Sequence, residues 1–210
     1  MATSKGDKFG TFLIAFGSVL ICICIVLVAH NARENLDAQS AVIEQLPAIH
    51  QVIEERKAAE HETSTPYIPM VTTDEEVAPE MTSVEINGYG YIGYLYFPSL
   101  DLELPVLDQC DSKRLRRAPC WYSGSYYTND LVIAAHNYRS SFGQLKNIIQ
   151  GDFVFFTDMD GNLRGYTVED IELLAPDDVE RMKESEFDLS LYTCTYDGSQ
   201  RLTVRCSEIK

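Results

Sequence analysis

Two side chains that flank a short turn near the C-terminus have the types needed for covalent catalysis. Cys194 and Arg201 are separated by a segment that contains Asp197-Gly198, a pair typical of a turn. If the flanking strands pair antiparallel across this turn, the thiol and the guanidinium become neighbours at its mouth. A guanidinium is always charged, favours thiolate over thiol and offers donors to an oxyanion. The spacing therefore predicts a nucleophilic cysteine with a cationic partner.

A second arginine and a second cysteine follow in the same predicted strand. Arg205 is four residues beyond Arg201, about 13 Å by the rise of a strand, so we expect it to be too distant to replace Arg201. Cys206 would lie toward the far end of the hairpin, beyond the Cα separation limit of about 7 Å for a disulfide with Cys194.

His136 is the only histidine in the predicted globular region, because the other three lie before residue 62. It ends an apolar run and precedes a polar loop, where strand ends present side chains to a cleft. A lone histidine is also common as a structural residue. Its convergence with Cys194 would permit acyl transfer, in which the thiolate attacks a carbonyl and the imidazole protonates the leaving amine.

Six cysteines are present, and Cys22 and Cys24 lie in an apolar segment. The four others permit disulfides in an exported domain, so a structural bridge is an alternative for each of them. Cys110 and Cys120 are the better candidates for a bridge, which leaves Cys206 unpaired. A non-catalytic, disulfide-stapled β-module for adhesion or signalling therefore stays open as an alternative.

The net charge of −15 disfavours a nucleic-acid partner, because phosphate binding needs clustered Lys and Arg. It also disfavours docking to an anionic membrane surface. Residues 31–80 hold eleven acidic and three basic residues, so about half of the net charge lies outside the predicted globular part.

The segment Phe9–Ala29 is uncharged and, as a helix, long enough to cross a bilayer core of about 30 Å. A cleaved signal peptide is the alternative, but its apolar region is usually shorter. We expect an uncleaved transmembrane anchor over residues 9–30. Lys5 and Lys8 precede the span and Arg33 follows it, which favours a cytoplasmic tail over residues 1–8 and an external C-terminal domain.

Residues 31–83 are predicted to form a helical stalk and an extended acidic linker. Apolar residues recur at helical spacing over residues 33–62, and Pro47 predicts two short helices there rather than one rod. The stalk would pack on the domain through its apolar stripe, with dimerisation as an alternative. Residues 63–82 contain three prolines and no apolar period, which indicates a tether.

The part after residue 84 is mainly β. Asp158–Asn162 reads as a hairpin turn, with an EF-hand-like calcium loop as the weaker alternative, because Leu163 occupies the position that needs glycine. Two short helices are expected within residues 141–149 and 176–182. Seven or eight short strands favour a closed or nearly closed β-barrel. The expected strands include residues 89–97, 102–107, 131–135, 152–157, 166–174, 189–194 and 201–206.

Three segments of the chain resemble the signature segments of sortases. The family hallmark is Thr-Leu-x-Thr-Cys with a following arginine and an upstream histidine. Here Ser190 replaces the first threonine, and Ala135 precedes the histidine where glycine is common. The resemblance covers residues 85–206. The three segments are Leu131-Val-Ile-Ala-Ala-His-Asn137, Phe142-Gly-Gln-Leu145, and Ser190-Leu-Tyr-Thr-Cys194 with Arg201 seven residues later.

The resemblance implies an eight-stranded sortase-type β-barrel with short helices as a catalytic domain over residues 84–210. It implies a cysteine transpeptidase, without a cofactor or a metal, that cleaves a C-terminal LPxTG-like sorting signal. Cys194 would carry the acyl group, His136 would act as general acid and base, and Arg201 would stabilise the oxyanion. Thr193 would contact the sorting signal.

The partners that the resemblance implies are proteins with a sorting signal and an amine acceptor, either a peptidoglycan precursor or a pilin lysine. The domain would act on the outer face of the cell membrane of a Gram-positive type cell. The His-Asn pair and the stalk resemble class B sortases, whereas the short connection between Leu174 and Asp188 resembles classes A, C and D. A thiol peptidase or amidase that uses only water is the alternative enzyme.

Overall fold

The structure is a computed structural model that describes residues 5–62 and 80–209. It divides into two units, residues 1–37 and residues 38–210, and each is described by itself. Of the tether predicted over residues 63–82, the part from 63 to 79 lies outside the described residues.

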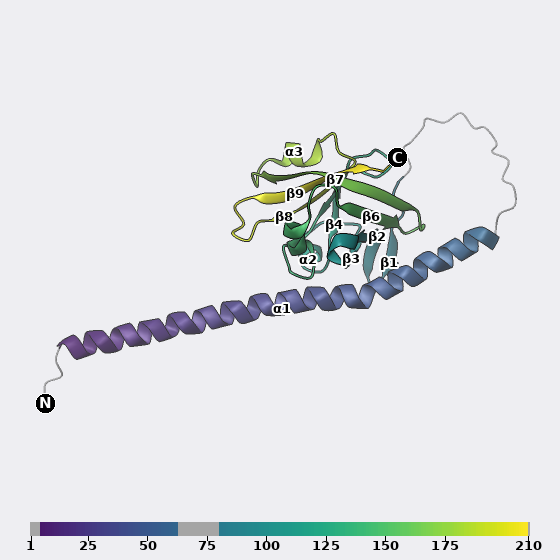
Figure 1. The fold of residues 1–210 in the computed structure, drawn as a ribbon. Helices are drawn as coiled ribbons and strands as arrows, with labels where there is room; N and C mark the ends of the chain where they lie inside the picture. The colour runs from purple at the N-terminus through teal and green to yellow at the C-terminus, as the bar shows by residue number, and fades with distance from the viewer. Residues whose placement is uncertain (1–4, 63–79, 210) are drawn as a thin grey trace. The chain divides into compact units, whose positions relative to one another are not determined.

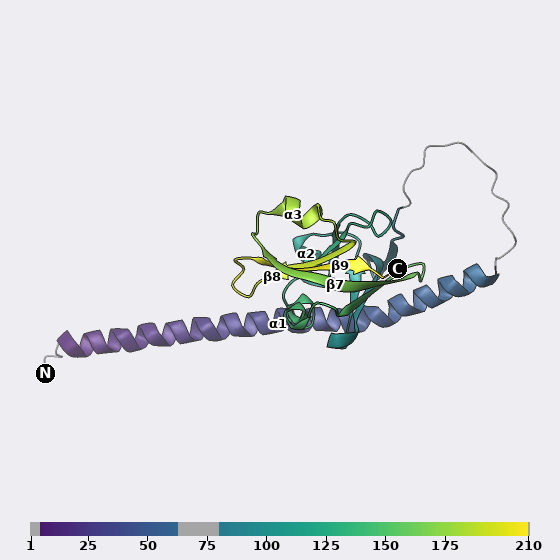
Figure 2. The same ribbon diagram turned by 45° about the horizontal axis from the view of Figure 1, so that its top comes forward.

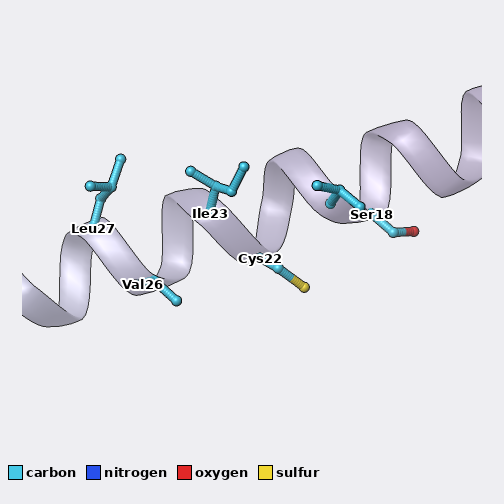
Figure 3. A pocket seen from close by; sticks show the side chains of 6 residues that line it. Ser18, Cys22, Ile23, Val26 and Leu27 are labelled. Atoms are coloured by element: carbon cyan, nitrogen blue, oxygen red, sulfur yellow. The ribbon is translucent and has the colours of Figure 1, made fainter.

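The first unit holds the apolar part of helix α1 (Lys5–Glu62). An 18-residue window in this helix has a mean hydropathy of 3.1 and is fully exposed, so α1 is long and apolar enough to cross a membrane. The Ser18 hydroxyl donates to the carbonyl of Ile14 at 2.9 Å, which satisfies this polar group within the helix. A pocket on α1 is lined by side chains that include Ser18, Cys22, Ile23, Val26 and Leu27, which Figure 3 shows as sticks on the helix.

Pro47 does not divide α1, and the predicted pair of short helices is wrong. A proline inside a helix removes the hydrogen bond to the carbonyl four residues earlier, here that of Ile43. The Ile43 side chain is 66% exposed, so this carbonyl belongs to the solvent-facing side of the helix, where water can serve it. Burial of Ile49 and Ile53 after the proline stabilises the continuous helix, because packing contributes more to helix stability than local propensity does.

The second half of α1 packs on the globular domain, as expected for the stalk. Its buried residues recur at spacings of three and four, which places them on one face of the helix. Ile49 and Ile53 share an apolar cluster with residues of β1 (Val84–Ile86), β2 (Tyr89–Phe97) and the start of β4 (Cys120–Ser123). The His50 imidazole adds a 2.9 Å contact to the Glu103 carboxylate, beside the Tyr94 ring. The buried stalk residues are Ala38, Ala41, Gln45, Ile49 and Ile53.

In the described part of the chain, eight strands close the predicted barrel, whose strands Figures 1 and 2 draw from two sides. Neighbours run in the order β2-β3-β4-β5-β8-β9-β7-β6, and β6 pairs back with β2. A ninth strand, β1, pairs with the start of β2. The strands are β1 (Val84–Ile86), β2 (Tyr89–Phe97), β3 (Leu102–Leu107), β4 (Cys120–Ser123), β5 (Leu131–Ala134), β6 (Phe153–Asp158), β7 (Leu163–Leu174), β8 (Leu189–Cys194) and β9 (Arg201–Glu208).

Four short helical segments connect the strands. Two of them, η2 and α3, fall where the sequence predicts short helices. The segments are η1 (Pro98–Leu100), α2 (Ser112–Leu115), η2 (Phe142–Asn147) and α3 (Val179–Lys183).

Barrel closure depends on a glycine at the β2–β6 pairing. Gly93 pairs with Asp158 and has a φ of 148°, a conformation that side chains rarely adopt. A Cβ at Gly93 would lie 2.0 Å from the carbonyl oxygen of Thr157. The missing side chain therefore lets the first and last strands of the barrel approach.

The segment after β6 is the predicted hairpin turn, since Thr157 pairs with Leu163 across it. The buried Asp158 carboxylate accepts hydrogen bonds from the turn amides of Asp160 and Asn162 at 3.0 and 2.8 Å. The Tyr126 hydroxyl donates to it at 3.0 Å. Asp158 thus stabilises the turn itself. Within the described residues, no group of three or more His, Cys, Asp or Glu side chains is placed to hold a metal ion.

Candidate active site

The β8–β9 hairpin brings Cys194 and Arg201 together. The two residues are directly opposite each other in the antiparallel ladder, so their side chains lie on the same face of the sheet. Both side chains are partly exposed. The predicted neighbourhood of thiol and guanidinium is therefore present.

The turn between them is held by its own polar groups. The Asp197 carboxylate accepts hydrogen bonds from the hydroxyls of Thr195 and Ser199, at 2.6 and 2.8 Å. These bonds, with that of Thr195 the strongest, lower the pKa of Asp197 to about 2. Thr195 and Gln200 also close the turn by a backbone hydrogen bond of 2.9 Å. Such a network fixes the separation of the two strand ends.

Arg201 folds back over this turn. Its Nη1 donates to the carbonyls of Gly198 and Gln200, at 3.4 and 3.2 Å. A guanidinium carries five N–H donors, so these two contacts orient the group while its other nitrogens can serve a ligand beside Cys194.

His136 lies two residues beyond the end of β5, the strand that pairs with β8. Strand β5 runs parallel to β8, with Ala134 opposite Tyr192, so His136 is level with Cys194 two residues further along. The Ala135 amide donates to the Tyr192 carbonyl at 3.1 Å and continues this register. The His136 ring lies 5.1 Å from the Tyr138 ring between centroids.

Asn137 ties the two strand ends together. Its side-chain amide donates to the carbonyl of Thr195 at 3.3 Å. Behind it, Gly143 packs so closely that a Cβ there would lie 2.4 Å from the carbonyl oxygen of Asn137. The segment around His136 is thus fixed on one side by the β8–β9 turn and on the other by η2.

Alternation along β8 and β9 places Cys194 and Arg201 on the outer face of the barrel, and β5 ends on that face at Ala134, two residues before His136. Leu189, Leu191 and Val204 belong to the interior core. Successive strand residues point to opposite faces, so the residues between them face outward. The outer-face residues of the three strands are Val132 and Ala134 before His136, then Ser190, Tyr192 and Cys194, and then Arg201, Thr203 and Arg205.

Thr193 faces the opposite side from its neighbour Cys194. Its Oγ1 is buried and has no hydrogen-bond partner among the described residues. Both residues border a cavity of about 280 Å³ at the end of the barrel. A buried hydroxyl without a partner costs free energy, so Thr193 is suited to bind a polar group that enters. The other lining residues are Asn137, Phe142, Gly143, Lys146, Leu173, Thr195, Tyr196 and Leu202.

An aromatic pair continues the outer face beyond the thiol. Tyr192 contacts Tyr122 edge to face, with ring centroids 5.3 Å apart. Burial raises the pKa of Tyr192, and the neighbouring Tyr122 raises it further. Both rings pack against an apolar cluster that contains Met182 of α3. Tyr122 could not be expected from the sequence, because no sequence pattern predicts β4.

The other cysteines are placed unlike Cys194. Cys206 is fully buried in the barrel opposite Leu189, and burial raises its pKa. Cys110 and Cys120, the better candidates for a bridge, are both free thiols. The two thiols hydrogen-bond, which lowers the pKa of Cys110 and, with burial, raises that of Cys120. Cys194 is a free thiol as well.

A model of the family described as the Sortase domain matches residues 95–209, more than half of the chain. A comparison with curated proteins finds no match.

Solved structures match the fold across most of the chain. Sortase C of Streptococcus pneumoniae is 24% identical with a TM-score of 0.55, over 81% of this chain and 97% of that one. Sortase A of Corynebacterium diphtheriae is 18% identical with a TM-score of 0.53, over 87% and 93%. Sortase C of Clostridium perfringens with the C-terminal cell wall sorting motif is 18% identical with a TM-score of 0.51, over 80% and 90%. These likenesses show a sortase fold.

Proposed function

The chain belongs to the sortase family, and from this premise we propose that it is a membrane-anchored cysteine transpeptidase that processes C-terminal sorting signals. The observation that supports the proposal is the pairing of Cys194 with Arg201 at the ends of β8 and β9, with His136 two residues beyond the end of β5, which runs parallel to β8. A thiol, an imidazole and a guanidinium on neighbouring strands are the groups that acyl transfer needs.

Acylation begins with attack of the Cys194 thiolate on the carbonyl carbon of the scissile amide. The carbon–sulfur bond forms and the electron pair moves to the carbonyl oxygen, which Arg201 stabilises by donated hydrogen bonds. The tetrahedral intermediate then collapses, the carbon–nitrogen bond breaks, and protonated His136 gives its proton to the leaving amine. The product is a thioester on Cys194.

Transfer reverses these roles with a second amine. Neutral His136 takes a proton from the incoming amine as its nitrogen attacks the thioester carbonyl. Collapse expels the Cys194 thiolate and leaves a new amide bond, so no net oxidation and no cofactor is involved. Arg201 again donates to the oxyanion.

The substrate class follows from the family rather than from this chain alone. The Clostridium perfringens sortase C structure is one with the C-terminal cell wall sorting motif. For this chain we propose an LPxTG-like signal, with Thr193 contacting it in the cavity beside Cys194. The acceptor amine would belong to a peptidoglycan precursor or a pilin lysine.

The location follows from the apolar helix. Residues 9–30 would span the membrane, with residues 1–8 in the cytoplasm. Residues 31–83 would form a stalk and linker, and residues 84–210 the catalytic domain outside the cell. The stalk contacts of Ile49 and Ile53 support an intimate association of the last part of α1 with the barrel.

Cleavage of LPxTG-type peptides by the full chain in detergent, with and without an added amine, tests the function. We expect cleavage, capture of the acyl group by the amine, and a thioester adduct of peptide and Cys194 visible by mass spectrometry. Cys194→Ala should abolish the adduct. If the only product is the hydrolysed peptide even when an amine is added, the protein is a peptidase instead. If no peptide of a library is cleaved, the proposal is contradicted.

A further inference from the structure

Arg205 is a buried cation that the proposed chemistry does not use. Its side chain is 2% exposed and lies on the outer face of β9, opposite Ser190. A buried charge is costly unless it is paired and fully hydrogen-bonded. The acceptors around Arg205 therefore indicate what it does.

Three parts of the chain supply those acceptors. Nε donates to a Glu172 carboxylate oxygen on β7 at 2.8 Å, and Nη1 donates to the Ser190 hydroxyl on β8 at 2.7 Å. The remaining contacts are to the main chain of α3, where Nη2 reaches the Arg181 carbonyl at 2.5 Å and Nη1 the Met182 carbonyl at 3.3 Å. Arg205 thus joins two barrel strands to α3.

α3 cannot be stable on its own. It has five residues, and isolated helices of this length do not form in water. The last carbonyls of a helix lack intrahelical donors, and a cation beside them satisfies them and suits the helix dipole. Arg205 supplies such a cation. The Arg181 side chain adds a second link to the other oxygen of Glu172, at 2.6 Å.

The element that Arg205 anchors lies beside the candidate active site. Both ribbon views draw α3 outside the barrel next to β9 (Figures 1 and 2). Met182 of α3 packs in the outer-face cluster with Tyr122 and Tyr192. Tyr192 is two residues before Cys194 on the same face of β8. Displacement of α3 would therefore change the surface next to the reactive thiol.

We propose that Arg205 is a positioning residue: it holds α3 against the outer face, so that Met182, Tyr122 and Tyr192 form a preformed wall for bound substrate. The proposal rests on the proposed transpeptidase function and names a part of its binding surface. Because these side chains are already ordered before substrate binds, the free energy of binding is not reduced by the entropy cost of ordering them. Loss of the anchor should weaken binding more than it slows the chemical step.

Arg205→Lys is the informative substitution. A lysine has one nitrogen and can keep the ion pair with Glu172, but it cannot reach acceptors on three elements as a planar fork does. We expect the folded variant to show KM for a sorting-signal peptide raised about tenfold, equivalent to about 1.4 kcal/mol, with kcat changed less than about threefold. Alkylation of Cys194 by iodoacetamide should keep the wild-type rate.

Arg164→Gln is the matched control. Arg164 donates to Glu208 at 3.0 Å, so it also links β7 to β9 through an arginine–carboxylate pair, at the other end of the two strands. We expect its KM to equal that of the wild type. Met182→Ala truncates one of the three wall residues without touching the anchor, and it should raise KM as Arg205→Lys does.

The outcomes separate this inference from the proposed function. Wild-type protein without cleavage or transfer contradicts both. Active wild-type protein with an unchanged KM in folded Arg205→Lys contradicts the positioning role alone, as does an equal rise in Arg164→Gln. If Arg205→Lys does not fold, Met182→Ala and Ser190→Ala decide by the same KM measurement, and two unchanged KM values overturn the proposal.

Discussion

The two ends of the β8–β9 hairpin carry the same residue types in opposite settings. At the mouth, Cys194 and Arg201 are opposite each other, half-buried, beside a turn. At the far end, Cys206 is 0% exposed and Arg205 is 2% exposed. The same two residue types therefore have different roles along the two strands. Cys194 and Arg201 at the mouth can contact a substrate, whereas Arg205 and Cys206 at the far end stabilise the fold.

The difference between the arginines lies in what accepts their hydrogen bonds. Arg201 donates to two carbonyls of an exposed turn, whereas Arg205 donates to a carboxylate, a hydroxyl and two carbonyls in the interior of the protein. A buried guanidinium that donates to four acceptors cannot move to an oxyanion. The sequence prediction that Arg205 is too distant from Cys194 agrees with its pairing to Ser190, four ladder positions away.

Cys194→Ala is the substitution with the largest expected effect. It removes the proposed nucleophile, so peptide cleavage should fall by about 10⁴-fold or more, while the Tm stays within about 2 °C because a partly exposed thiol contributes little packing. Peptide cleavage and thermal unfolding measure the two effects. Cys206→Ala is the matched control and should keep the kcat/KM of the wild type. A loss of activity in Cys206→Ala would contradict the assignment of catalysis to the mouth of the hairpin alone.

Arg201→Gln should have the next largest effect. Glutamine keeps a donor but loses the charge that favours the thiolate and stabilises the oxyanion, so we expect kcat to fall by about 10²-fold to 10³-fold. The measurement is kcat at saturating peptide, with circular dichroism to verify folding. A kcat within threefold of wild type would show that the guanidinium at the mouth only orders the turn.

Thiol labelling compares the cysteines directly. Under native conditions Cys194 and the partly exposed Cys110 should react with iodoacetamide, whereas Cys206 and Cys120 should react at least about a hundredfold more slowly, since they need an opening of the core. Mass spectrometry of tryptic peptides over time resolves the four sites. Rapid labelling of Cys206 would contradict its assignment to the core.

The mouth of the hairpin could be predicted from the sequence because its determinants are local. The Asp197-Gly198 turn fixes the register, and strand alternation then puts Cys194 and Arg201 on one face. His136 could be chosen as the candidate base because the sequence has no other histidine after residue 61. Its alignment with Cys194 depends on the parallel pairing of β5 with β8, which brings together residues 58 positions apart.

The far end could not be predicted because its partners are distant in sequence. The acceptors of Arg205 lie 15 to 33 residues away in the sequence, and no local sequence pattern predicts them. Strand β4 was missed because it has four residues and a bulge after Trp121. Pro47 was misjudged for a related reason, since local propensity predicts a break and only contacts of the stalk with the barrel oppose it.

Cys206→Ala should lower stability and leave catalysis unchanged. The thiol is packed in the core beside Leu189 and acts there as a small apolar group. Its truncation leaves a small cavity, so the free energy of unfolding should fall by about 1 kcal/mol. Cys206→Val refills the space and should recover most of the loss. Urea unfolding followed by tryptophan fluorescence measures both, and equal stability of all three proteins would contradict the packing role.

The last expected effect is the share of the pH dependence of stability that comes from Cys206. Burial raises the pKa of this thiol above its ordinary value of 9.0. The folded state therefore keeps the proton at a pH where the unfolded chain releases it, so this contribution to stability is complete below pH 9 and is lost as the pH rises. Wild-type protein should lose up to about 1.4 kcal/mol per pH unit more than Cys206→Val above this point. Urea unfolding of both proteins at pH 8 and 10 measures the difference, and parallel curves would place Cys206 in contact with solvent.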